Sequence, residues 1–525
     1  MNKNLNILVL PMDDRPCTYN FPFQLGQMYG ANIIMPDKNL LGNLERVADP
    51  QQLEKWILDN SNNLDGIIIS SDSLAYGGLI PSRRNYQSFD NIAQNFKIIK
   101  LLKDKNKDIP IYVCSTILRI SNSNENQEEK QYWKEYGQLI YNYSYLIHKN
   151  YLINEGDYDQ YDSQKIINKQ FVDPKITEIR NIIPDEIIQD YIDGRFKNFR
   201  LNKLLLKLVK EKYIDFLSIC ADDSSQYGFN VIEKNIFNKI VENNPSIKDK
   251  VLIYPGTDEA VSCLMARMIN KYNDFIPKFY PIYSDLSKSG NIITMYEGIP
   301  LNSTLKSQIK AIGGKLVNSV SESDISIYLH TSEKNQEDQY LNSIYQKPTI
   351  QASESSINDE LNYFINNQSQ NIALADVAFA NGGDNNFINS LSKVYDLKKL
   401  MTYSAWNTAG NSIGTALAHS SIRFLAKNND NNSSLDNKHF EFLFERFFDD
   451  WLYQGFTRLK FIEENGFPLD QKQLVDLSDY TKEVCQDFIN NNLKNDQIKS
   501  IDITSISFPW KRPFEIEIKC KLTPH

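Results

Sequence analysis

Short apolar runs alternate with longer, helix-length segments along the first half of the chain. An uninterrupted apolar run between polar residues is typical of a strand that is covered on both faces of its sheet. The alternation predicts βα units and a largely parallel sheet. The predicted strands lie in the ranges Asn6–Leu10, Ala31–Met35, Leu64–Ser70, Ile109–Thr116, Phe216–Ala221 and Val251–Tyr254.

These six strands, with two more expected between Lys278 and Met295, fit an α/β fold. The arrangement is either a (β/α)8 barrel or an elaborated doubly wound sheet, and we expect the barrel. The chain has 525 residues, which is more than one ordinary domain. We predict a barrel-like α/β domain over 1–285, a second, smaller α/β domain over 286–426 and a C-terminal helical and β extension over 438–525. The polar run Lys427–Asn437 is predicted to be a flexible linker.

Acidic residues follow three of the predicted strands. Asp222 and Asp223 end one, Asp258 and Glu259 follow another, and Asp13, Asp14 and Arg15 follow the first. Ligands of α/β proteins collect at the carboxyl ends of parallel strands, so a carboxylate-lined pocket is expected there. Neighbouring carboxylates repel each other, which can leave one of them protonated as an acid. A single such pair is more simply a helix N-cap, but three repeats favour a pocket.

Three further segments place polar side chains after apolar runs. The indole of Trp406 could pack on a sugar ring while Asn side chains bind hydroxyl or acetamido groups, although a structural Trp beside a capped helix explains that segment equally well. The pair Gly77-Gly78 lacks the spacing of a phosphate loop. The candidate binding residues from the three segments are Asp72, Tyr76 and Arg83, then Asp376, Asn381 and Asp384, and finally Trp406, Asn407 and Asn411.

Composition narrows the function classes. The formal net charge of −9 argues against a nucleic-acid partner, because phosphate binding needs a basic face. The five histidines and six cysteines lack metal-ligand spacing, so we expect no cofactor and no zinc site, while carboxylate-bound Mg²⁺ remains open. The apolar runs are too short for a signal peptide or a membrane span, and we expect a cytoplasmic protein with reduced thiols. The oligomeric state is open.

Six motifs together resemble the bacterial domain of unknown function 4127 family over nearly the whole chain. That resemblance implies no reaction. The motifs are Pro11–Pro16, Ser71–Leu79, Ala221–Asp223, Gly256–Glu259, Asp376–Asp384 and Ala405–Asn411.

Two strand ends are also similar to those of hexosaminidases. The Gly-Thr-Asp-Glu segment is similar to the Gly-Gly-Asp-Glu of glycoside hydrolase family 20, without the His that precedes it there, and Ala-Asp-Asp is similar to family 84. In those families one carboxylate orients the substrate acetamido group, which is the nucleophile, and the other is the general acid.

We therefore expect a glycoside hydrolase that acts on small glycosides, including N-acetylhexosaminides. Asp223 would be the general acid and Asp222 the orienting group, with Asp258 and Glu259 as a reserve pair. One alternative is a hydrolase or lyase whose divalent metal binds Asp13, Asp222, Asp258 and Glu259. Another alternative is a non-catalytic sugar or small-molecule binding protein.

Overall fold

Six of the apolar runs form a parallel sheet in the computed structural model. The structure describes residues 5–152, 173–284, 289–332, 335–347, 354–428, 433–493 and 498–524. Every strand pair in this sheet is parallel, and the strands lie in the order β2-β1-β3-β4-β5-β6. Their bounds are β1 (Asn6–Leu10), β2 (Asn32–Ile34), β3 (Gly66–Ser70), β4 (Ile111–Ile117), β5 (Phe216–Ala221) and β6 (Val251–Pro255).

Helices cover both faces of this first sheet, which explains why its strands are apolar throughout. In β1, Leu8 and Leu10 point into one core while Ile7 and Val9 point into another. The face of Ile7 and Val9 is covered by α1 (Asn20–Tyr29) and α13 (Ala260–Tyr272). The other face is covered by α2 (Pro50–Asp59), α3 (Ser71–Tyr76), α5 (Phe89–Asn95), α6 (Lys97–Lys105), α11 (Asp185–Lys210) and α12 (Phe229–Glu242). Helices α7 (Trp133–Ile147) and α10 (Pro174–Ile182) add apolar residues to the same core, and α4 (Leu79–Arg84) packs on α3 and α11.

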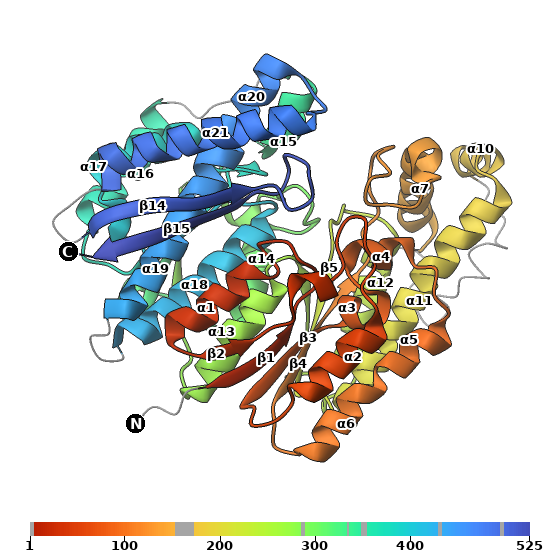
Figure 1. Ribbon diagram of the computed structural model, residues 1–525. Coiled ribbons are helices and arrows are strands. Elements are labelled where there is room, and N and C mark those ends of the chain that lie inside the picture. Colours follow the sequence, from red (N-terminus) through yellow and green to blue (C-terminus); the bar gives the residue numbers. More distant parts are fainter. Residues whose placement is uncertain are drawn as a thin grey trace.

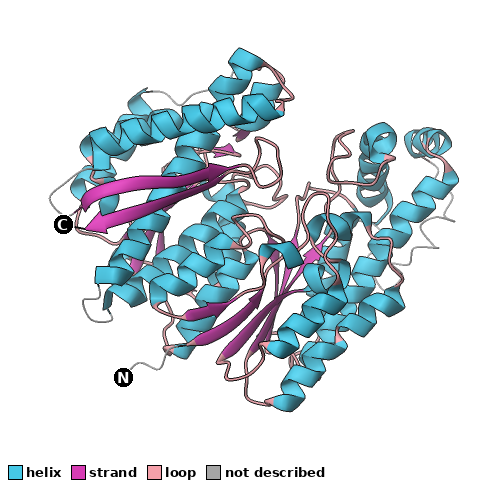
Figure 2. Cartoon of the chain, viewed as in Figure 1, coloured by secondary structure: helices cyan, strands magenta, loops and turns pink. Residues whose placement is uncertain are grey.

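A second parallel sheet repeats the strand order of the first. Its order, β13-β11-β9-β7-β8, again places the second strand at an edge beside the first, with later strands added on the other side. Figure 2 shows the strands of the first sheet together, with helices on both sides of them. The strands are β7 (Lys278–Tyr283), β8 (Lys315–Leu316), β9 (Ile325–His330), β11 (Ile372–Asp376) and β13 (Thr402–Ser404).

A shared layer of helices joins the two sheets. Helix α13 packs on α18 (Ala409–Asn428), and α18 packs in turn on α14 (Leu301–Ala311) and α1. Their apolar residues form one core with residues from both sheets. The far side of the second sheet carries α16 (Glu354–Asn366) and α17 (Asn385–Val394). The short elements beside it are α15 (Gln339–Ile344), β10 (Glu337–Asp338) and β12 (Phe379–Ala380).

The C-terminal part packs against the second sheet and ends in an antiparallel hairpin. Its helical stretch runs through α19 (Ser433–Arg446), a π-helix (Phe447–Thr457), α20 (Arg458–Asn465) and α21 (Gln471–Phe488). Strands β14 (Ile498–Ser507) and β15 (Glu517–Pro524) pair with each other. Figure 1 shows the loop between them reaching toward the loops of the first sheet.

Several expectations about architecture change. In the described residues β2 and β6 stand at the two ends of the strand order, so the closed barrel is not confirmed. The run from Lys278 pairs in the second sheet, because local periodicity does not tell which sheet a strand joins, and this pairing falls before the expected boundary at 285.

The predicted linker Lys427–Asn437 is helical at both ends, since α18 extends to Asn428 and α19 starts at Ser433, while residues 429–432 lie outside the described part. Among the helices that the structure describes, none is both long and apolar enough to span a bilayer.

Candidate functional site

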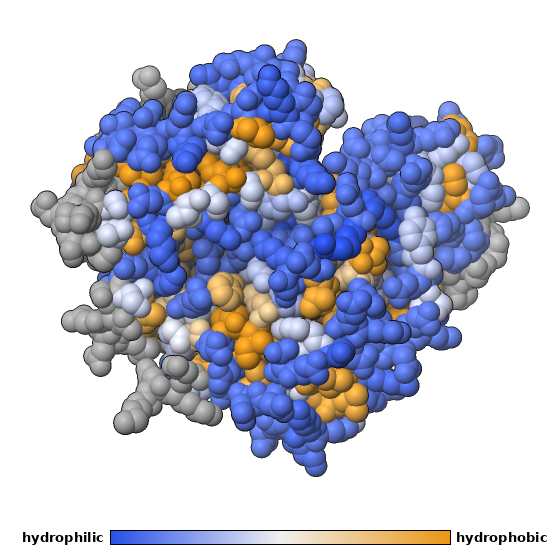
Figure 3. Space-filling model, viewed as in Figure 1, coloured by the Kyte–Doolittle hydropathy of each residue, from blue (hydrophilic) through white to orange (hydrophobic). Residues whose placement is uncertain are grey.

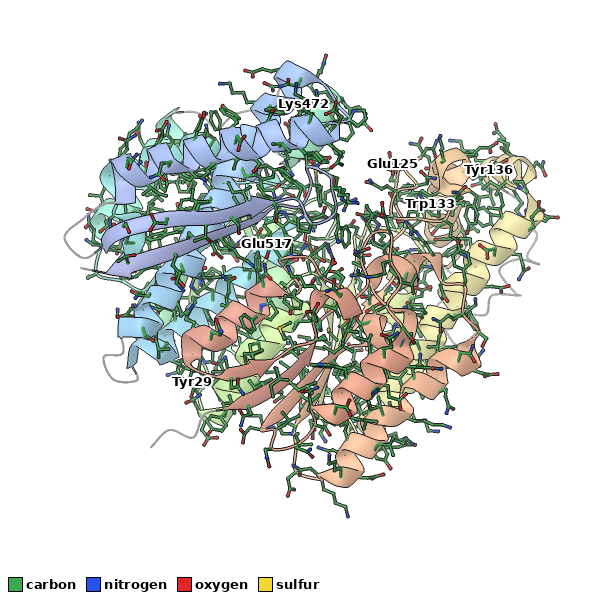
Figure 4. All side chains as sticks on the ribbon, in the orientation of Figure 1. Tyr29, Glu125, Trp133, Tyr136, Lys472 and Glu517 are labelled. Carbon is green, nitrogen blue, oxygen red and sulfur yellow. The ribbon has the colours of Figure 1, made fainter. Side chains whose placement is uncertain are left out.

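The loops after strands of both sheets meet below a surface hollow. Figure 3 shows this hollow between the part of the molecule that carries α20 and α21 and the part that carries α7, with a largely hydrophilic surface. In Figure 4, Lys472 of α21 lies on one flank, and Glu125, Trp133 and Tyr136 lie on the other. A hydrogen bond from Asn407, after β13, to Asp258, after β6, joins the two sheets at this place.

Arg15 holds the first acidic cluster together. Its Nη1 and Nη2 donate to both oxygens of Asp258 at 3.1 and 2.7 Å, while Nε and Nη2 donate to Asp13 at 3.0 and 2.8 Å. Although burial opposes it, Asp13 and Asp258 hold the pKa of Arg15 well above its ordinary value. The cluster lies in the interior, where such a fork of hydrogen bonds fixes both carboxylates in place.

The turn between β14 and β15 reaches this cluster. Trp510 packs under Arg15, with the guanidinium carbon 5.0 Å from the ring centroid, and its indole nitrogen donates to Asp14 at 2.8 Å. Arg46 also lies 3.6 Å from Asp14. Asp14 therefore anchors the C-terminal hairpin to the first sheet.

The second acidic cluster contains Asp222 and Asp223 in unequal surroundings. Arg83 donates to Asp222 from Nη2 at 2.7 Å and from Nε at 3.2 Å. Asp223 is paired with Arg119 at 3.0 Å, and its side chain is 29% exposed. Burial, followed by the charge of Asp222, raises the pKa of Asp223 to about 7, against the arginines that lower it. Because the side chain keeps contact with water, solvent moderates this shift.

A third carboxyl group, Glu259, is buried away from the hollow. Gln308 donates to its Oε1 at 2.5 Å, and Oε2 has no hydrogen-bond partner among the described residues. Burial raises the pKa of Glu259 to about 8, against the hydrogen bond from Gln308 that lowers it. Glu259 is therefore largely protonated at pH 7. It shares no hydrogen bond with Asp258, its partner in the expected reserve pair, whose carboxylate binds Arg15.

Two candidate residues after β3 lie in the core. Asp72 accepts from Thr116 at 2.9 Å, and burial raises its pKa to about 7. Tyr76 is buried in the apolar core of the first sheet.

The candidates of the second sheet mostly hold backbone in place. Asp376 accepts from the backbone of Asp384 at 2.7 Å, and Asp384 in turn caps the start of α17. Asn411 accepts from the backbone of Thr257, and Asn381 donates to Asp338 at 2.8 Å. Trp406 is buried beside Phe514, with ring centroids 6.2 Å apart.

Comparison with known families identifies the chain. A family model described as "Protein of unknown function (DUF4127)" matches residues 7–519. The chain belongs to the DUF4127 family. The resemblance predicted from six motifs is thus confirmed. No curated protein and no solved structure matches the chain.

The six sequence motifs occupy equivalent places in the structure. Each of the six begins at, or directly after, the carboxyl end of a strand: β1, β3 and the neighbouring β5 and β6 in the first sheet, and β11 and β13 in the second. The six motifs therefore lie at the carboxyl edges of the two parallel sheets, which is where α/β proteins bind ligands.

Sequence reasoning missed two arginines of this candidate site. Arg119 follows β4 and pairs with Asp223, so the same rule about strand ends could have found it. Arg512 comes from the turn between β14 and β15, and it pairs with Glu128 and Glu515. No local signal in the sequence shows where that turn packs. In the part of the chain that the structure describes, no group of three or more His, Cys, Asp or Glu side chains is arranged to hold a metal ion.

Glu259→Gln should leave stability at pH 7 within about 1 kcal/mol of the wild type, because Gln resembles the protonated carboxyl group. The folded-state pKa lies above the unfolded value, so the wild type loses stability as pH rises toward about 8. Between pH 7 and pH 9 the free energy of unfolding of the wild type should fall by about 1.4 kcal/mol more than that of Glu259→Gln. Urea unfolding at both pH values measures this difference, and equal losses in the two proteins would show that Glu259 is already ionised at pH 7.

Proposed function

We propose that the protein is a glycoside hydrolase that acts on small glycosides, including N-acetylhexosaminides. Asp223 is the general acid, and Asp222 orients the acetamido group of the substrate. The observation that carries this proposal is the pair itself, in which one carboxylate accepts two hydrogen bonds from Arg83 while its neighbour has a pKa of about 7. Pairs of carboxyl groups in such unequal surroundings are how enzymes divide acid and base roles.

The reaction uses the two groups in different ways. Asp223 donates its proton to the glycosidic oxygen as the bond to C1 breaks, while the acetamido oxygen attacks C1. Asp222 accepts a hydrogen bond from the acetamido N–H, which increases the electron density on that oxygen. Water then opens the cyclic intermediate, and Asp223 accepts the proton of this water, so the enzyme returns to its starting state.

The position of the pair supports this assignment. Both residues follow β5, which lies between β4 and the edge strand β6 in the first sheet. Asp223 keeps part of its side chain exposed, whereas Asp258 has both oxygens bound by Arg15 and Glu259 is almost completely buried. Asp223 is therefore the best placed of these groups to meet a substrate.

A panel of nitrophenyl glycosides, assayed with and without EDTA, tests the proposal. We expect nitrophenol release from at least one N-acetylhexosaminide, at a rate that EDTA does not change. Loss of activity on chelation would favour the metal-dependent hydrolase. Tight sugar binding without turnover of any glycoside would favour a binding protein instead.

We also propose a cytoplasmic location. All six cysteines are free and buried, which suits a reducing compartment. The assay panel should therefore be run under reducing conditions, and activity should not depend on an oxidant.

A further inference from the structure

Three arginines converge on one carboxylate, that of Glu128, and two of them come from distant parts of the chain. Arg83 from the end of α4 and Arg119 from the loop after β4 donate to its Oε2 at 2.5 and 3.0 Å. Arg512 from the turn between β14 and β15 donates to its Oε1 at 2.5 Å. Both oxygens are thus held by planar guanidinium groups, which is the arrangement that proteins use to bind a carboxylate ligand.

Glu128 itself belongs to an irregular segment, not to a helix or strand. The segment 118–132 connects β4 with α7, and Glu128 keeps 18% of its side chain exposed beside the hollow. Although burial opposes it, Arg512, Arg119 and Arg83 hold the pKa of Glu128 well below its ordinary value. A charged carboxylate on this segment therefore fills a site with one donor, Arg119, from the start of the same segment and two, Arg83 and Arg512, from other parts of the chain.

An open pocket lies directly beside these arginines. Its volume is about 20 Å³, so a ligand larger than a water molecule also needs the space that Glu128 would leave. Arg83 and Arg119 line it together with Lys130, Arg195, Tyr132 and Trp133. Trp133 is buried, and its indole N–H has no hydrogen-bond partner among the described residues. Cationic and aromatic side chains thus lie together beside the place that the Glu128 carboxylate occupies.

The charges around the arginines favour a monoanion. Arg83, Arg119 and Arg512 also contact Asp222, Asp223, Glu129 and Glu515. If Glu128 leaves, a ligand carboxylate restores the charge that was lost, whereas a phosphate dianion adds one more negative charge to a site already rich in them. A carboxylate is therefore the better match.

We propose that Arg83, Arg119 and Arg512 bind a carboxylate of the substrate, and that Glu128 occupies this place when no substrate is bound. The substrate class is then sugar acids, such as uronic acids or N-acetylhexosamines that carry a carboxylate. The glycosidic part of this statement rests on the proposed function, but the carboxylate site does not. Because Arg83 and Arg119 also hold Asp222 and Asp223, the bound carboxylate would fix the sugar beside the candidate acid.

Calorimetric titration with glucuronate, glucose and glucose 6-phosphate tests the site without any need for turnover. Glu128→Ala should bind glucuronate at least about tenfold more tightly than the wild type, because the ligand no longer competes with the loop carboxylate. Arg512→Gln should bind it at least about tenfold more weakly. The matched control is Glu125→Ala, which removes the same charge from an exposed position of the same segment and should leave the affinity unchanged.

Each outcome decides the question. Unfolding temperatures of all variants establish that they are folded, and Arg512→Lys replaces Arg512→Gln if the latter is not. The site is refuted if folded Glu128→Ala binds glucuronate no better than the wild type, or if Glu125→Ala gives the same gain. Tighter binding of glucose 6-phosphate would refute the carboxylate preference. If Glu128→Ala binds glucuronate tightly but no glycoside is hydrolysed, the site stands and the hydrolase proposal fails.

Discussion

Asp223→Asn should lower kcat/KM for glycosides with poor leaving groups by about 10²- to 10⁴-fold, which is the usual loss when a general acid is removed. The amide cannot donate a proton to the departing oxygen. Nitrophenolate leaves without a proton, so the loss for nitrophenyl glycosides should be much smaller. Asp222→Asn should slow both kinds of substrate, since orientation of the acetamido group is needed in each case. Steady-state kinetics with matched alkyl and nitrophenyl glycosides measure these differences.

The pH profile provides an independent check of the same acid. Asp223 must carry its proton in the active enzyme, and its pKa is about 7. The rate for alkyl glycosides should therefore fall with rising pH above about 7, and this decline should be absent from the residual activity of Asp223→Asn. Asp185→Asn, at a position whose side chain is 86% exposed, serves as the control and should match the wild type. Wild-type turnover by Asp223→Asn together with an inactive Glu259→Gln would move the acid to the loop after β6.

The rule that ligands gather at strand ends was enough to predict much of the candidate site. It led to Asp13, Arg15, Asp222, Asp223 and Asp258, which the structure brings together in two arginine-linked clusters. The positions of these residues could be predicted because each depends only on recognising a buried strand and the residues after it, which is local information.

The same rule could not tell which side chains turn inward. Asp72 follows β3 as directly as Asp222 follows β5, but it is completely buried and binds Thr116. Asp384 looked like a ligand contact and instead caps a helix. The direction of a side chain at a strand end depends on packing by elements elsewhere in the chain, and the sequence pattern does not contain that information.

Contacts between distant segments were beyond local reasoning for a similar reason. Trp510 and Arg512 lie in the predicted helical and β extension, whose pattern does not show where it packs, yet Trp510 packs on Arg15 and Arg512 completes the cluster around Glu128. The pairing of β7 with β9, rather than with the first sheet, is also a long-range choice. The strand order therefore had to come from the structure. The structure also shows that the two parallel sheets have the same strand order and share one layer of helices.

Arg15→Met should destabilise the protein by about 3–5 kcal/mol at neutral pH, which is the usual cost of removing one partner from a buried ion pair. Met fills a similar volume, so the loss reflects the two carboxylates left without a cation and not a cavity. Asp13 and Asp258 each lose two or more hydrogen bonds, and Trp510 loses the guanidinium above its ring. Urea unfolding measures the free-energy difference.

The destabilisation should depend on pH in a defined direction. Burial already raises the pKa of Asp258, and Arg15 is the main group that lowers it, so removing Arg15 raises this pKa further. A carboxyl group whose folded pKa exceeds its unfolded value loses stability as pH rises through that interval. The difference in unfolding free energy between the wild type and Arg15→Met should therefore be larger at pH 8 than at pH 5. Arg46→Met, at a side chain that is 42% exposed and 3.6 Å from Asp14, should cost less than about 1 kcal/mol at either pH. An Arg15→Met protein as stable as Arg46→Met would mean that Arg15 does not hold the acidic cluster together, and the arrangement of Asp13 and Asp258 would need another explanation.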